Sequence, residues 1–139
     1  MGAWYEIAHL PNKKEKRCVA DGEILYALAD KPAHFQVVTT CRLKDGSSYV
    51  RNANGRTQDK HSTDGKLKVV STFPFSKKYW VLAIDPDYSW ALVGSPNRKT
   101  LWILSRTPVM LPETLSMIEA RATTQGFNTA KLLTVPQHP

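Results

Sequence analysis

The chain has 139 residues, of which 42% are hydrophobic and 22% charged, and its formal net charge is +7. This length suits one domain over residues 1–139, and the composition excludes collagen, coiled coil and intrinsic disorder. Charged or turn residues interrupt every hydrophobic run, so no segment reaches the roughly 20 apolar residues of a membrane-spanning helix. The basic balance favours anionic partners such as lipid headgroups, phosphate or nucleic acid without choosing among them.

The first three-quarters of the chain predict an all-β meander. Short apolar or alternating runs end at clusters of Asp, Gly, Pro and Asn, which are the residues that tight turns demand. We expect eight strands, at about residues 3–9, 18–29, 34–43, 48–58, 66–73, 78–85, 89–95 and 100–106. Consecutive strands joined by such short connectors should pair antiparallel.

The last part of the chain predicts one helix over residues 112–125. Pro112 suits a first helical turn, apolar residues follow at helical spacing, and Gly126 ends the run. A short extended tail is expected at residues 130–135.

Eight strands avoid exposed edges most simply by closing into a barrel, whose interior holds one small ligand. A β-sandwich is the alternative architecture. Alternation along the strands favours the barrel, because it turns the small residues Ala53, Gly55 and Thr57 inward and leaves space unfilled.

Three blocks of sequence carry a family resemblance. They are Gly2-Ala3-Trp4-Tyr5-Glu6-Ile7-Ala8, residues 79–94 and residues 101–108, and residues 126–132 extend the match. Together they resemble the lipocalins, and most closely the bacterial outer-membrane lipoprotein lipocalins. The resemblance implies an eight-stranded antiparallel up-and-down barrel, open at one end, with a C-terminal α-helix packed outside. It also implies a cavity for fatty acids or lysophospholipids and a location in the periplasm or at the outer membrane, although this chain shows no signal peptide.

The resemblance also assigns roles to particular side chains. Tyr79 and Trp102 are the leading ligand contacts. The further expected contacts are Tyr26, Tyr49, Val69, Phe73, Phe75, Val81 and Leu104. The alternative is that these side chains only fill a packed core. Gly2, Trp4 and Arg106 are expected to be structural, with the Arg106 guanidinium lying across the Trp4 indole.

The two cysteines, Cys18 and Cys41, fit neither a metal knuckle nor a redox pair. A hairpin that turns near residues 30–33 brings them within a few residues of register. They therefore predict a structural cross-strand disulfide and an oxidising compartment such as the periplasm, the alternative being two buried thiols.

Charge is expected to be uneven along the barrel, because alternate connectors of a meander lie at the same end. The connectors after the first, third, fifth and seventh strands carry nine basic residues against Glu15 and Asp45, a net charge of +7. The nine are Lys13, Lys14, Lys16, Arg17, Lys44, Lys77, Lys78, Arg98 and Lys99. This basic rim predicts headgroup contacts at Lys77, Lys78, Arg98 and Lys99 and peripheral contact with an anionic membrane. The alternative is a rim that is merely solvated.

Enzymatic chemistry finds little support in the sequence. The four histidines are scattered without metal-ligand spacing, and neither a Gly-x-Ser-x-Gly elbow nor a phosphate loop occurs. We therefore expect no catalysis, metal or cofactor. Nucleic-acid binding would need outward aromatic side chains and is not expected.

The sequence as a whole predicts binding and carriage or storage of a fatty acid or lysophospholipid by a monomer or homodimer. One alternative is a cavity for a bulkier hydrophobe, such as a tetrapyrrole or a sterol-like molecule. The other is a non-enzymatic module that interacts with proteins or membranes.

Overall fold

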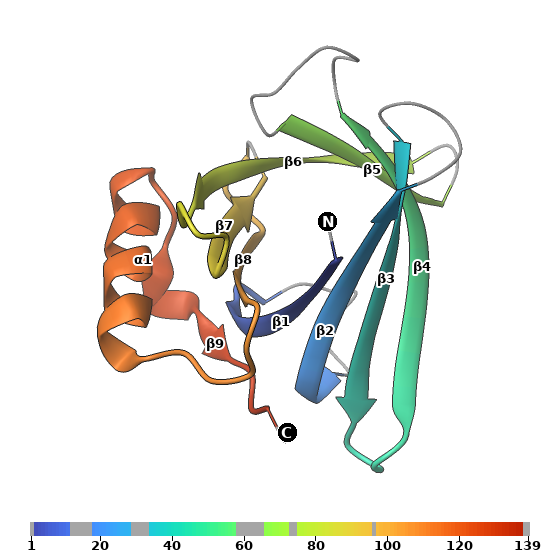
Figure 1. Cartoon of the computed structure of the whole chain (residues 1–139), viewed down its shortest axis with the longest axis horizontal. Coiled ribbons are helices and arrows are strands. Elements are labelled where there is room, and N and C mark those ends of the chain that lie inside the picture. The colour runs from blue at the N-terminus through green and yellow to red at the C-terminus, as the bar shows by residue number, and fades with distance from the viewer. Residues whose placement is uncertain are drawn as a thin grey trace.

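A computed structural model of the chain describes residues 2–11, 18–28, 34–57, 66–72, 75–95 and 97–137. It contains one sheet of consecutive antiparallel strands and one α-helix outside that sheet (Figure 1). The strands are β1 (Gly2–His9), β2 (Cys18–Leu28), β3 (His34–Leu43), β4 (Ser48–Thr57), β5 (Lys66–Thr72), β6 (Phe75–Ile84), β7 (Trp90–Gly94) and β8 (Leu101–Ser105). After them come α1 (Pro112–Thr124), a 3-10 helix (Thr129–Lys131) and the short β9 (Leu133–Thr134).

The eight long strands close into a ring. Each strand from β2 to β8 pairs with its chain neighbour, and β1 pairs with both β8 and β2. No sandwich of two sheets is therefore needed to cover strand edges. The predicted all-β fold with eight antiparallel strands and a helix near the C-terminus is confirmed.

Alternation along the strands gives the sheet two different faces. The inner face carries a buried cluster made by Trp4, Ile24, Phe35, Val37, Ala91, Val93, Trp102 and Leu104. The outer face of β7, β8 and β1 carries a second cluster, which packs against the helix. A bulge between Glu6 and Ala8 moves β1 from one cluster to the other, because Trp4 belongs to the first and Ala8 to the second.

The helix α1 covers the outside of the barrel (Figure 1). Pro112 occupies the first turn, and Ile118 and Ala122 are fully buried against the strands. Gly126 ends the helix with a φ of +93°, a conformation that a residue with a Cβ adopts only with strain. No helix among the described residues is long and apolar enough to cross a membrane.

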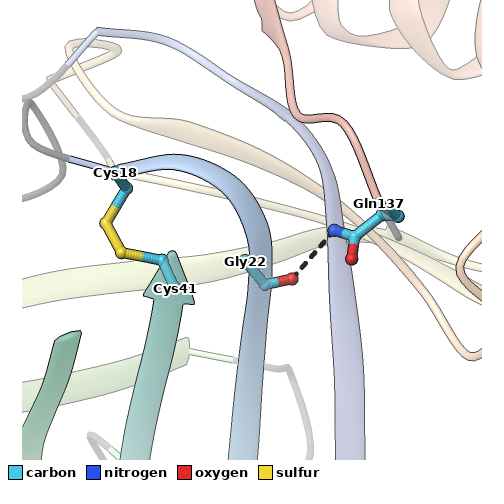
Figure 2. The surroundings of a disulfide bond; sticks show 4 residues. All are labelled: Cys18, Gly22, Cys41 and Gln137. Atoms are coloured by element: carbon cyan, nitrogen blue, oxygen red, sulfur yellow. Dashed lines mark hydrogen bonds between the residues drawn. A yellow bond between two sulfur atoms is a disulfide. The ribbon is translucent and has the colours of Figure 1, made fainter. Parts of the chain in front are cut away.

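The predicted disulfide between Cys18 and Cys41 is present (Figure 2). In the strand register Cys18 lies opposite Leu43, two residues beyond Cys41, so the bridge runs diagonally between β2 and β3. Two irregularities in β2, around Ala20 and before Glu23, shift the register there. The Cα atoms of the two cysteines are 5.6 Å apart, a usual separation for such a bridge.

The C-terminal tail bridges β1 and β2 beside this disulfide. The pairing of β1 with β2 ends at Tyr5 and Glu23, and beyond that point β9 pairs with β1. The Gln137 side chain donates to the carbonyls of Glu6 and Gly22, at 2.7 and 3.0 Å. Figure 2 shows the second of these hydrogen bonds, next to the disulfide. The tail therefore supplies hydrogen bonds where the first two strands separate.

Candidate functional site: an apolar cavity in the barrel

The inner cluster leaves a cavity of about 140 Å³. Its walls are aliphatic or aromatic side chains from six strands: Trp4, Tyr26, Phe35, Val81, Ile84, Ala91, Val93 and Leu104. Tyr26 and Phe35 flank the connection between β2 and β3, and Ile84 and Ala91 flank the turn between β6 and β7. The cavity therefore lies toward the barrel end at which β2 and β6 finish and β3 and β7 begin.

One wall depends on a close approach between β3 and β4. Phe35 lies opposite Gly55 in the strand register, and its ring occupies the position that a Cβ on residue 55 would need. The Phe35 ring also meets Tyr26 edge-on, with centroids 5.9 Å apart and planes at 62°. The absence of a side chain at Gly55 thus lets two aromatic rings line the cavity.

The base of the cavity is held by the expected contact between Trp4 and Arg106. The Arg106 Cζ atom lies 3.6 Å from the centroid of the indole ring. Its Nη1 atom also donates a hydrogen bond of 2.9 Å to the carbonyl of Ala3. The cation–π contact is worth about 1 kcal/mol and fixes the indole plane. Trp4, which the sequence assigned only a structural role, therefore also lines the cavity.

The predicted ligand contacts fall into three groups. Tyr26, Val81 and Leu104 line the cavity. Trp102 is buried in the inner cluster and Tyr49 is half-buried on β4, but neither belongs to the cavity wall. The remaining predicted contacts lie outside what the structure describes, for Phe73 entirely and for the side chains of Val69, Phe75 and Tyr79.

Four wall residues escaped the sequence reasoning: Phe35, Ile84, Ala91 and Val93. Strand alternation contained the signal for three of them. Phe35 shares a face with Val37 in β3, and Ala91 shares one with Val93 in β7. Ile84 could not be found in this way, because a bulge between Val81 and Ala83 changes the facing of β6.

The predicted basic rim is only partly described. Residues 12–17, with four of the basic residues, lie outside the described part of the chain, and Lys44 and Lys99 are exposed. The prediction that Lys77 and Lys78 lie in a connector is wrong, because β6 begins at Phe75, three residues earlier than expected. Both lysines pair with β5 positions, and the register joins Thr72 directly to Phe75.

Arg98, one of the predicted headgroup contacts, hydrogen-bonds to the residue that follows α1. Its Nε atom donates a hydrogen bond of 2.7 Å to the carbonyl of Gln125, the residue that follows α1. A cation at this end of a helix also interacts favourably with the helix dipole. The Arg98 guanidinium is thus tied to the outer helix.

The described titratable groups do not form a reactive cluster. No three His, Cys, Asp or Glu side chains among them come close enough together to hold a metal ion. Asp45 and Asp85 have lowered pKa values, because the hydroxyls of Ser47 and Ser89 donate to their carboxylates. Both aspartates lie in turns, where such contacts stabilise the turn.

Comparison with known proteins decides the family. The family profile described as "Lipocalin-like domain" matches residues 1–137. The chain belongs to the lipocalin family. Lipocalins bind small hydrophobic ligands and are in general binding proteins rather than enzymes.

Two relatives show how far the similarity extends. Temperature-induced lipocalin-1 of Arabidopsis thaliana is 37% identical over 149 residues, covering 99% of this chain and 76% of the plant protein. Outer membrane lipoprotein Blc of Escherichia coli K12 is 34% identical over 137 residues, again covering 99% and 76%. The predicted resemblance to the bacterial lipoprotein lipocalins is confirmed.

Solved lipocalin structures confirm the fold at lower identity. Lobster apocrustacyanin A1 superposes with a TM-score of 0.75 at 19% identity, covering 99% of this chain and 77% of that one. Insecticyanin from Manduca sexta gives a TM-score of 0.73 at 23% identity, covering 96% and 76%. At such identities the likeness shows the barrel architecture alone.

Proposed function

We propose that this lipocalin binds and carries or stores a fatty acid, a lysophospholipid or a similar amphiphile in its barrel, without catalysis. The observation that carries this proposal is the apolar cavity between Trp4, Tyr26 and Phe35. Its aliphatic and aromatic walls suit a hydrocarbon chain.

The size of the cavity favours a slender ligand over a bulky one. Sites for drug-sized molecules usually measure about 300–1,000 Å³, whereas this cavity measures about 140 Å³. It accommodates the end of an acyl chain, and the rest of the chain would extend along the barrel axis. Each buried methylene contributes about 0.8 kcal/mol.

The charged end of such a ligand would point toward the basic connectors. Lys44 and Lys99 lie exposed on connections at the end opposite the cavity. Positive charge there would attract anionic headgroups and support peripheral contact with anionic membranes, at about 1 kcal/mol per basic residue near the surface. Lys77 and Lys78 would add to this charge from β6.

Two observations support a location in the cell envelope. The Escherichia coli and Vibrio cholerae relatives are named outer membrane lipoproteins. The disulfide between Cys18 and Cys41 persists best in an oxidising compartment such as the periplasm.

The direct test is displacement of an environment-sensitive fatty-acid probe by palmitate and by a lysophospholipid, at low and high salt. We expect saturable displacement at one ligand per chain, weakened by salt. Lys99→Gln should reduce the salt dependence, with exposed Lys131→Gln beside the outer helix as the matched control. No probe binding, and no lipid retained in native mass spectrometry, would contradict the proposal.

A further inference from the structure

A partly buried arginine, Arg51, lies on the inner face of β4. Exposed and buried positions alternate along this strand: Asn52 and Asn54 are exposed, whereas Gly55 is buried. Arg51 and Ala53 share the inward parity of Gly55, and both are partly buried. The Nη1 atom of Arg51 is fully buried.

This guanidinium has an unmet hydrogen-bonding requirement. Among the residues that the structure describes, none accepts a hydrogen bond from the Arg51 Nη1 atom. Glu6, the acidic side chain described on the inner face of β1, packs against Gly22, and two strands lie between β1 and β4. A buried donor without an acceptor is costly, so an anion within reach of the Nη1 atom would be stabilised there.

The position of Arg51 relates it to the cavity. Arg51 pairs with Thr39, Thr39 pairs with Ile24, and Ile24 pairs with Trp4 of the cavity wall. On β4, Gly55 lies four residues from Arg51, which is about 13 Å at 3.3 Å per residue. The ring of Phe35 packs against Gly55. Between Arg51 and Gly55 the inward residue is the small Ala53. A hydrocarbon chain in the cavity could thus extend past small side chains to the guanidinium.

We propose that Arg51 forms an anion subsite inside the barrel, which binds the carboxylate or phosphate of an amphiphile whose hydrocarbon end occupies the cavity. This inference rests on the proposed function and adds a selective residue to it. Arginine stays charged at every physiological pH and offers a planar pair of donors that fits both anions. The exposed lysines would then attract the ligand, and Arg51 would select its headgroup.

The test compares ligands that share a chain and differ in the headgroup. Dodecanoate, dodecyl phosphate and the uncharged dodecanol are each titrated against a bound fluorescent probe, in the native protein and in Arg51→Gln. We expect the native protein to prefer an anion over dodecanol by about tenfold to a hundredfold, the range for hydrogen bonds to charged groups. In R51Q this preference should fall to about twofold while dodecanol binds as before. The two anions separate a carboxylate ligand from a phosphate one.

Each outcome bears on a different claim. Retention of the full anion preference in R51Q would overturn the Arg51 assignment and leave the proposed function standing. Failure of all three ligands to bind the native protein would overturn both. Lys131→Gln is the matched control, since it removes one exposed charge beside the outer helix and should leave the anion preference unchanged. If R51Q does not fold, the NMR resonance of the Arg51 Nε group in the native protein provides the test. This resonance should shift on binding of dodecanoate and not of dodecanol. Equal shifts with both ligands would overturn the assignment.

Discussion

Filling the cavity provides a quantitative test of where the acyl chain lies. Ala91 is 4% exposed and lines the cavity from β7, next to Leu104 on β8. Ala91→Leu adds three carbon atoms at this wall. If they displace about three methylenes of ligand, each worth about 0.8 kcal/mol, binding weakens by about 2.4 kcal/mol, or about 50-fold. The added side chain is itself buried, so the free energy of unfolding should stay unchanged or rise.

The assay is competition by saturated fatty acids of increasing length, with thermal unfolding measured in parallel. In the native protein affinity should rise with length and then level off, and in A91L the plateau should begin about three methylenes earlier. Ala120→Leu, at an exposed position of α1, is the matched control and should bind as the native protein does. A folded A91L protein with unchanged affinity and an unchanged plateau would refute the assignment of the acyl chain to this cavity.

Three further predictions concern interactions that stabilise the barrel and its turns. Gln137→Ala removes two hydrogen bonds to strand carbonyls and should lower the free energy of unfolding, measured in urea titrations, by about 1–3 kcal/mol. An unchanged free energy of unfolding would show that the tail does not stabilise the contact between β1 and β2. Replacing Cys18 and Cys41 by serine should lower the free energy of unfolding by about 3 kcal/mol relative to the oxidised native protein. The reduced native protein is the control and should show a similar loss, and equal stability of the oxidised protein and the variant would contradict this role of the disulfide. Ser89→Ala should raise the pKa of Asp85 toward its ordinary value, followed by NMR titration. Because the pKa of Asp85 is lowered in the folded protein, its contribution to stability is present above the unfolded pKa and is lost as pH falls through the folded pKa. If the pKa of Asp85 were the same in Ser89→Ala as in the native protein, the Ser89 hydroxyl would not be the cause.

Local sequence patterns predicted the strands because turn residues mark nearly every connector. Seven of the eight strand starts were placed within one residue, and α1 begins at Pro112 as expected. The exception is β6, where Lys77 and Lys78 resemble a solvated connector. Pairing with β5 outweighs this local preference, since Lys77 and Lys78 pair with Val69 and Lys68.

The site was harder to predict, because it depends on contacts between distant segments. Alternation predicted that Tyr26 faces inward, and the family resemblance implied the same for Leu104. The same alternation contained the signal for Arg51, which was not among the predicted ligand contacts. Alternation did not predict that Ile84 lines the cavity, because the bulge between Val81 and Ala83 changes which face of β6 it lies on. The hydrogen bond from Arg98 to Gln125 joins residues 27 positions apart and leaves no trace in local periodicity.

The central claim is that an amphiphile lies in the barrel with its hydrocarbon end in the described cavity. A crystal structure of the complex with a terminally brominated fatty acid tests it most directly, because anomalous scattering locates the bromine. The account predicts one bromine site between Trp4, Tyr26 and Phe35. Bromine at the basic rim, on the outer face beside α1, or at no ordered position would contradict the account.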